Sequence, residues 1–401
     1  MSAVFDGVVG QGTARRSLER TLTRWAGGSG GLHHAYLLTG DEEYPRPDGD
    51  ELPPGRAGAA LRPLGQGQWR LARQLAALIL VGGRPDHDDY LRALHGAHPD
   101  LQVIEREGDL IRLDQVAALV AQSALRPLTA PRRVWLLDEA DKLHAAAANK
   151  LLKSLEEPPA YAHFVLATAE PARMLPTIVS RCEVVACEPV AGSEIAAHLR
   201  ERCGVLAVTA DALAALARGS VSRAERLAAD EASGRRQRLI GWALGAVHGD
   251  EASADGLLAE VTAAQGAVQE ALEARLAADL ERLAADTADE RDLAWRQKRF
   301  KERARREVAR NQRIAALDAF DLLVSVLRDL WVVSTGQTAV LLNNDRAGQL
   351  AEHAALPAQA YASMLAVAGA TRRDMLLNVD RALALRAMFF RMLEVSRTCA
   401  T

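Results

Sequence analysis

Short apolar runs of strand length alternate with helix-length segments through the first half of the chain, and this alternation restricts the fold more than any other feature. Residues 134–137 and 164–167 are two such runs, and polar residues follow each at once. Strands that alternate with helices at this spacing are typical of a parallel sheet covered on both faces. After Glu188, strand-like runs nearly vanish and alanine- and leucine-rich helical patterns take over. We therefore predict an α/β core with a parallel sheet, followed by helical regions.

The length of the chain, 401 residues, is large for one domain, so two or three domains are expected. The change of pattern suggests a core at 1–189, a small helical unit at 190–234 and an all-helical region at 235–401. Residues 41–64 interrupt the core with a composition dominated by Pro, Gly, Asp and Arg. Such a composition buries too little apolar surface to offset the entropy of ordering, so we predict a mobile insertion at 41–64.

Charge and cysteine usage narrow the class of protein. The net charge of −3 gives no overall attraction to nucleic acid or to anionic lipid. No pair of cysteines has C-x-x-C spacing, which favours buried, reduced thiols and a reducing compartment. The N-terminus lacks a charged and then apolar leader, and no stretch reaches the ~18 apolar residues that a membrane span needs. We expect a soluble, cytoplasmic protein.

Polar residues stand where two of the predicted strands end. Asp138 and Glu139 follow the run at 134–137, and Thr168 ends the run that begins at residue 164. In phosphate-loop enzymes, a carboxylate after such a strand holds Mg²⁺ and another polar group orients the attacking water. Further along, Arg181 lies just past a helix-sized segment. This part of the chain has most of the polar groups of a nucleotide-hydrolysing site.

The loop that should bind the phosphates is missing. A phosphate loop needs G-x-x-x-x-G-K-[ST], which supplies backbone amides and a lysine, and no such string occurs in the chain. A predicted strand ends at Gly40, and the helical pattern resumes only near Gly65 and Gly67. Gln68 then stands at the lysine position and Trp69 at the Ser/Thr position. Glutamine has no charge to neutralise phosphate and tryptophan is no ligand for Mg²⁺, so we predict a protein that acts on a partner's nucleotide.

Several sequence blocks together resemble one family. The blocks are 9–11, 34–40, 98–100, 138–141, 149–159 and 180–182, with weaker matches at 328–331 and 378–385. The chain resembles clamp-loader subunits of the AAA+ class, among them the delta-prime type of bacterial DNA polymerase III. The likeness covers residue 4 to about residue 232, and the blocks at 149–159 and 180–182 are its most specific parts.

The resemblance implies a RecA-like core, a small helical lid and a helical collar that holds a hetero-pentamer. It implies tau/gamma and delta subunits as partners, which together open a sliding clamp and close it on primed DNA. It also implies that Arg181 is an arginine finger, which stabilises charge on the transferring phosphoryl group in a neighbouring tau/gamma subunit. ATP and Mg²⁺ would be bound by that neighbour. We therefore expect this chain to have no cofactor and no ATPase activity of its own, and to act as a part of the DNA polymerase III holoenzyme.

The same resemblance outlines a degenerate nucleotide site in this chain. Thr168 occupies the place of a polar sensor of the γ-phosphate and also suits a hydrogen bond to nearby backbone. Arg223 stands at the position of a second sensor residue of the family, and a surface arginine is the alternative interpretation. The residues of the degenerate site are Gly40, Gly65, Gly67, Gln68, Trp69, Asp138, Glu139, Thr168 and Arg223.

Many members of the family carry four zinc-binding cysteines shortly before the block at 98–100. The corresponding positions here are near Ile79, Arg84, His87 and Tyr90, of which only His87 can bind a metal. A structural zinc needs four Cys or His ligands, so we predict no metal site. An alternative site built from loop histidines and carboxylates has its members at Asp86, His87, Asp88, Asp89, His95 and His98, and such groups are usually solvated.

Two other functions remain open at this point. The first is an ATP-hydrolysing tau/gamma-like motor subunit whose phosphate loop is divergent rather than lost. Nucleotide binding by the isolated chain would distinguish this motor from a subunit that acts on a partner's nucleotide. A DNA-binding AAA+ repair protein would need DNA affinity with a steep salt dependence. The basic residues between 295 and 313 offer a phosphate-binding stripe, but interspersed acidic residues favour a solvated helix.

Overall fold

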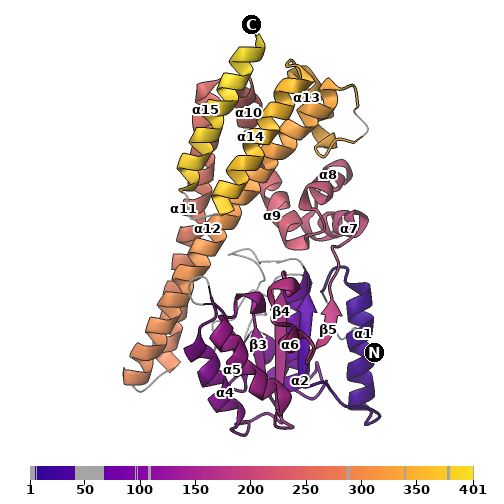
Figure 1. Cartoon of the computed structure of the whole chain (residues 1–401), viewed down its shortest axis with the longest axis vertical. Helices are drawn as coiled ribbons and strands as arrows, with labels where there is room; N and C mark the ends of the chain where they lie inside the picture. The colour runs from indigo at the N-terminus through magenta and orange to yellow at the C-terminus, as the bar shows by residue number, and fades with distance from the viewer. Residues whose placement is uncertain are drawn as a thin grey trace. The chain divides into compact units, whose positions relative to one another are not determined.

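The computed structural model describes residues 7–40, 67–94, 98–106, 110–286, 290–337, 340–376 and 380–400, together with Phe5 and Gly96 (Figure 1). The chain forms two compact units. The first comprises Met1–Ala191 with Ser220–Ser222 and Glu281–Asp289, and the second comprises Gly192–Gly219, Arg223–Leu280 and Glu290–Thr401. The predicted insertion at 41–64 lies outside the described residues. The division at 189 and 234 into core, lid and collar stays a prediction.

A parallel sheet forms the centre of the first unit. Its strands are β1 (Ala35–Thr39), β2 (Leu101–Ile104), β3 (Arg133–Leu137), β4 (Ala162–Thr168) and β5 (Glu183–Ala186). They lie in the order β2-β3-β4-β1-β5, and each neighbouring pair is parallel. β4 is buried along its whole length, as expected for a central strand with both faces covered. The structure confirms the predicted α/β core.

Successive side chains of a strand point to opposite faces of the sheet, so each strand contributes residues to two hydrophobic cores, one on each face. On one face, Tyr36 and Leu38 of β1 pack with residues of α1 (Gly12–Ala26), α2 (Gly67–Leu80) and α3 (Asp88–Leu94). On the other face, Leu37 packs with residues of α4 (Leu113–Ser123), α5 (Ala145–Glu156) and α6 (Pro176–Val179). Figure 1 shows α1 on one side of the sheet and α4 and α5 on the other. Within this second core the ring of Trp135 stacks on that of Phe164, and their centroids lie 5.3 Å apart.

Asp100 holds the loop that leads into β3. Its buried carboxylate accepts hydrogen bonds from the backbone N–H groups of Leu128, Thr129 and Ala130 at 2.7–3.0 Å, and from the hydroxyl of Thr129. Burial raises the pKa of Asp100, but these hydrogen bonds outweigh it and hold the pKa below its ordinary value of 3.8. The block at 98–100, which contributed to the family resemblance, therefore has a structural role in this chain.

Asp100→Asn is expected to lower the free energy of unfolding by about 2–3 kcal/mol, because hydrogen bonds to a buried charged group are the strong ones. A folded-state pKa below the unfolded one stabilises the protein above the unfolded pKa, and this stabilisation is lost as pH falls through the folded pKa. The gap between wild type and variant should thus be full at pH 7 and shrink below pH 3.8. Urea unfolding at pH 7 and at a pH below 3.8 measures this difference in the free energy of unfolding. Asp114→Asn, at an exposed position, is the control. A gap independent of pH would contradict the assignment.

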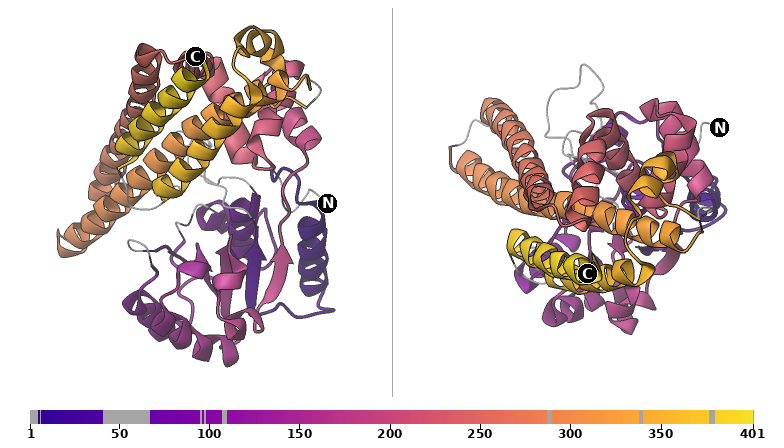
Figure 2. Two further views of the ribbon diagram at one scale, coloured as in Figure 1. Left: turned by 45° about the horizontal axis from the view of Figure 1, so that its top comes forward. Right: turned by 90° about the horizontal axis from the view of Figure 1, so that it is seen from above.

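The second unit is helical throughout its described residues. It contains α7 (Gly192–Cys203), α8 (Ala207–Ala217), most of α9 (Val221–Ala232), α10 (Arg235–Val247), most of α11 (Glu251–Asp286), α12 (Glu290–Ser334), α13 (Ala347–His353), α14 (Ala358–Leu376) and α15 (Arg381–Ala400). α11 and the first part of α12 run side by side (Figure 2), and Gln312 Nε2 donates to the Gln265 carbonyl at 3.2 Å. No helix in the described part of the chain is apolar over enough length to cross a membrane.

A buried ionic network ties α10 to the segment before α13. The guanidinium of Arg236 is fully buried and binds both carboxylate oxygens of Asp345 at 2.7 and 2.9 Å. It also donates to Glu231 and to the side-chain oxygen of Asn343, each at 3.0 Å. Asn343 is held in turn by the buried carboxylate of Asp329. Buried charges need this degree of pairing, because an unpaired one is strongly destabilising.

Candidate functional site

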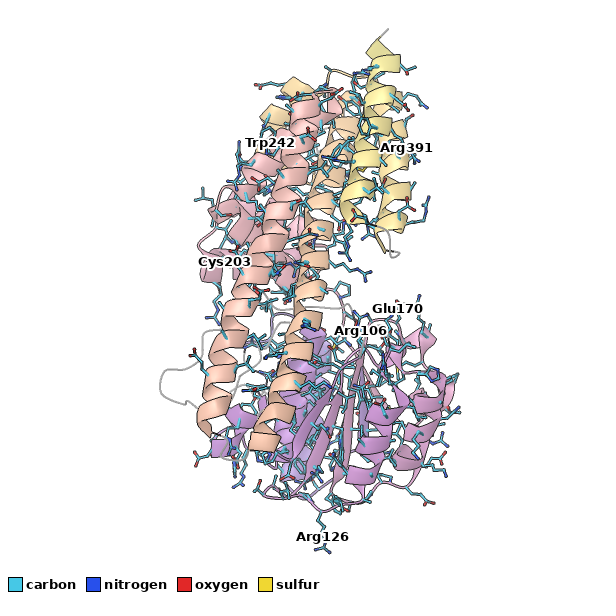
Figure 3. All side chains as sticks on the ribbon, turned by 90° about the vertical axis from the view of Figure 1, so that its left-hand side faces the viewer. Arg106, Arg126, Glu170, Cys203, Trp242 and Arg391 are labelled. Carbon is cyan, nitrogen blue, oxygen red and sulfur yellow. The ribbon has the colours of Figure 1, made fainter. Side chains whose placement is uncertain are left out.

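The polar residues predicted at strand ends lie at one edge of the sheet, where the carboxyl ends of β1, β3 and β4 meet. Ligands of open parallel sheets bind outside this edge. Figure 3 labels Arg106 and Glu170 at this end of the first unit and Arg126 at the opposite end. Of the predicted site, Gly40, Gly67, Gln68, Trp69, Asp138, Glu139 and Thr168 lie in the described part of the first unit, whereas Gly65 lies outside the described residues.

Gln68, at the lysine position in the first turn of α2, binds to the edge of the sheet. Its side chain is buried, and its amide nitrogen donates to the carbonyl of Leu38 at 2.9 Å and to that of Thr168 at 3.1 Å. The backbone N–H of Gly40 donates to the same Thr168 carbonyl at 3.2 Å. A phosphate-binding lysine must extend away from the sheet toward its ligand. The side chain of Gln68 instead points to the sheet and binds the ends of both β1 and β4.

Trp69, at the Ser/Thr position, belongs to the hydrophobic core. It is 9% exposed and packs in the cluster that lies between α2 and the sheet. The guanidinium of Arg73, one turn further along α2, lies 5.9 Å from the indole ring and donates to the Leu94 carbonyl. The side chain that would be a Mg²⁺ ligand in an intact loop therefore supports the packing of α2.

Glu139 is already paired with a cation. Its carboxylate is 5% exposed and accepts a hydrogen bond from Nε of Arg106 at 2.8 Å. Its backbone has a φ of 49°, in the left-handed region that non-glycine residues seldom adopt, and its N–H donates to Oδ1 of Asp138 at 3.0 Å. A carboxylate that activates water in a nucleotide site must face that water. Here an arginine that follows β2 binds it.

Thr168 and Asp141 form a second set of internal contacts at the same edge. The Thr168 hydroxyl donates to Oδ1 of Asp141 at 2.7 Å and accepts from the backbone N–H of Glu170 at 3.1 Å. The other oxygen of Asp141 lies 2.8 Å from Nζ of Lys142. The hydroxyl at the sensor position thus satisfies nearby protein groups, as one of the two readings of the sequence expected.

Arg223, the other expected sensor, pairs with carboxylates of α12 in the second unit. Its Nη1 lies 3.0 Å from Asp321 and its Nε lies 3.6 Å from Asp318. Arg226, one turn further along α9, also binds Asp318, at 2.6 Å. These ion pairs give Arg223 a role in holding α9 against α12.

Arg181 lies at the surface in the turn between α6 and β5. Its side chain is 33% exposed. Nη1 donates to the Thr177 carbonyl at 2.9 Å, and Nη2 donates to Oε1 of Glu156 at 2.5 Å. The neighbouring Cys182 packs against the core, and burial raises the pKa of its thiol to about 12, so the sulfur stays protonated and unreactive. The turn thus combines an anchored cysteine with an arginine that reaches solvent.

Sequence reasoning missed Arg106, Lys142 and Glu156, which neutralise or bind the predicted site residues. Arg106 comes two residues after the end of β2, and that end lies at the same edge of the sheet as Glu139. The rule that parallel strands share one carboxyl edge would have found it. Glu156 could not be found in this way, since it comes from the end of a helix.

The region before the block at 98–100 has no cluster of metal ligands among its described residues. Ile79 is fully buried in α2, and Tyr90 is 8% exposed in the core. Nδ1 of His87 lies 3.9 Å from Oδ2 of Asp89. His95, one member of the alternative cluster, lies outside the described residues. The absence of zinc stays a prediction. Metal analysis of purified protein is expected to give no stoichiometric zinc, and about one zinc per chain, as a four-ligand structural site binds, would contradict it.

Comparison with known proteins shows that part of the chain is similar to subunits of DNA polymerase III. The family described as "DNA polymerase III, delta subunit" matches residues 63–191. DNA polymerase III subunit delta-prime of Bacillus subtilis is 36% identical over 27% of this chain and 32% of its own length. The delta-prime subunit of Pseudomonas aeruginosa is 32% identical over 55% of this chain and 64% of its own length. The tau/gamma subunit of Haemophilus influenzae is 29% identical over 49% of this chain and 25% of its own length.

These matches span 32% and 64% of the two delta-prime relatives' own length. The family match at 63–191 contains both the block at 98–100 and the turn with Arg181. The chain is thus similar to delta-prime subunits of DNA polymerase III over less than two thirds of their length.

Proposed function

We propose that this chain is a stator subunit of the DNA polymerase III clamp loader, which binds no ATP and completes the ATPase site of a neighbouring tau/gamma subunit with Arg181. The neighbour binds ATP and Mg²⁺, and the assembled pentamer with delta loads the sliding clamp on primed DNA. An arginine supplied in trans stabilises the charge that develops on the transferring phosphoryl group.

The observation that carries this proposal is the side chain of Gln68. At the lysine position of the phosphate loop it is buried and bound to the carbonyls of Leu38 and Thr168. A lysine that bridges the β- and γ-phosphates contributes charge that an uncharged, inward-facing amide does not supply. The geometry therefore favours a core that has kept its nucleotide-binding fold and lost its nucleotide.

The remaining groups at the sheet edge support the same conclusion. Glu139 is paired with Arg106 and Asp141 with Lys142, so cations of the chain itself already bind both carboxylates. Arg181, in contrast, is partly exposed on a short turn with an anchored base. Its position suits contact with another subunit better than contact with its own sheet edge.

Co-assembly tests this function. The chain is co-expressed with the tau/gamma and delta subunits of the same organism, and the purified complex is analysed by native mass spectrometry and by clamp loading on primed DNA. We expect a five-subunit complex with one copy of this chain, and we expect loading to fail when the chain is omitted. A complex that assembles and loads clamps equally well without it would refute the proposal.

A tau/gamma-like motor with a divergent phosphate loop is the second candidate, because the Haemophilus tau/gamma subunit matches nearly half of the chain. It requires the isolated chain to bind and hydrolyse ATP. The internal bonds of Gln68 and Glu139 argue against it, because both side chains would have to leave their partners to reach a nucleotide.

A further inference from the structure

Arg181 is held by a carboxylate from a separate helix. Oε1 of Glu156, the last residue of α5, accepts from Nη2 of Arg181 at 2.5 Å, while the Thr177 carbonyl accepts from Nη1 at 2.9 Å. A guanidinium has five N–H donors in a fixed plane. Two acceptors on two different elements therefore fix both the position and the orientation of that plane, and three N–H groups remain for other acceptors.

Both partners stand next to residues that are buried in one hydrophobic core. Leu155, next to Glu156, is 1% exposed, and Ile178, three residues before Arg181, is also 1% exposed. The two side chains belong to the same hydrophobic core, and α5 packs against α6. Pro158 and Pro159 follow after Glu157 and prevent α5 from continuing, so Glu156 stands at the helix end.

Helix stability does not explain a glutamate at this position. The C-terminal end of a helix carries partial negative charge, so an acidic residue is unfavourable there and a basic one is favoured. The ion pair does not explain it either, because Glu156 is 45% exposed and Arg181 is 33% exposed, and exposed pairs contribute little to stability. A role in orienting Arg181 accounts for both the residue type and its place.

We propose that Glu156 is a positioning residue for Arg181. In the assembled complex it holds the guanidinium in the plane from which the free N–H groups reach the phosphates on the neighbouring subunit. Because the pair is exposed, it gives way at little cost if the phosphates require a small rotation. Residues that orient a catalytic group improve the reaction rate without contacting the substrate themselves. This inference rests on the proposed function of Arg181.

The test uses the reconstituted pentamer with clamp and primed DNA, and measures the ATPase kcat and KM. Glu156→Ala is expected to lower kcat roughly three- to ten-fold at the site that Arg181 serves, with little change in KM, in the range of coupling between contacting residues. The loss in kcat of the whole complex should be no larger than that of Arg181→Ala. Glu156→Gln keeps the acceptor oxygen and should restore most of the rate. Glu157→Ala, which removes an exposed glutamate one residue further along, is the matched control and should have wild-type kcat.

The double variant with Arg181→Ala separates positioning from a general structural role. If Glu156 acts through Arg181, the double variant has the kcat of Arg181→Ala alone. Additive losses, or a Glu156→Ala loss no larger than that of Glu157→Ala, would overturn the inference while leaving Arg181 as the finger. A wild-type kcat for Arg181→Ala itself would overturn the proposed function and this inference with it.

Discussion

Arg181→Ala is expected to leave the subunit folded and assembled, and to slow ATP hydrolysis by the reconstituted clamp loader. The side chain is 33% exposed and its ion pair with Glu156 lies at the surface, so stability should change little. At the site it serves, an arginine finger contributes on the order of a thousand-fold or more in kcat. The loss for the whole complex should be smaller, because the resemblance implies that other motor sites have fingers of their own.

Two further variants make this result specific. Arg181→Lys should recover little activity, because an ammonium group cannot reproduce the planar fork of a guanidinium. Arg173→Ala removes a nearby arginine that is 62% exposed and paired with Glu170, and it should keep the wild-type rate. Steady-state ATPase and clamp loading are compared at matched assembly, which native mass spectrometry verifies. Equal rates for wild type and Arg181→Ala would remove the finger role from this residue.

Arg236→Ala is expected to cost about 3–5 kcal/mol in the free energy of unfolding of the second unit, because it leaves the buried carboxylate of Asp345 with only a longer contact, 3.6 Å, to Arg346. The guanidinium is fully buried and makes four hydrogen bonds to Glu231, Asn343 and Asp345. Burial lowers the pKa of Arg236, but the hydrogen bonds and charges of Asp345 and Glu231 outweigh it and raise the pKa. The arginine is therefore charged in the folded protein.

Urea unfolding measured by circular dichroism checks this expectation, since the second unit is helical throughout its described residues. Arg238→Ala is the matched control. Arg238 lies on the same helix, 50% exposed, and pairs with Glu260, so its loss should barely shift the transition. An equally small shift for Arg236→Ala would show that the buried network is not a main source of stability in this unit.

The sequence was sufficient to predict central strands of the sheet, but not its edge strand β5. The runs at 134–137 and 164–168 have the length and apolar residues of buried strands, and the structure places β3 and β4 over them. Their terminal polar residues lie at one edge because parallel strands share a direction. Local patterns determine such features, since strand length, burial and direction follow from neighbouring residues.

The partners of the site residues depend on contacts between distant parts of the chain. Gln68 binds a carbonyl 100 residues away, Glu139 binds an arginine 33 residues away, and Arg181 binds a glutamate 25 residues away. The sequence predicted that Gln68 had lost the charge of lysine, but not that its amide joins two strands. Helical patterns likewise predicted the second unit without the buried Arg236 network, because periodicity gives no information about which polar residues meet.

The most direct test of the central claim, that this chain acts on a partner's nucleotide rather than its own, is an equilibrium titration of the isolated protein with a fluorescent ATP analogue and Mg²⁺. The isolated tau/gamma subunit of the same organism is the positive control, and excess unlabelled ATP identifies specific binding. We predict no saturable, competable binding in the micromolar range, because Gln68 and Trp69 replace the phosphate-binding lysine and the Mg²⁺ ligand. Competable binding of one analogue per chain with a micromolar Kd would contradict the claim.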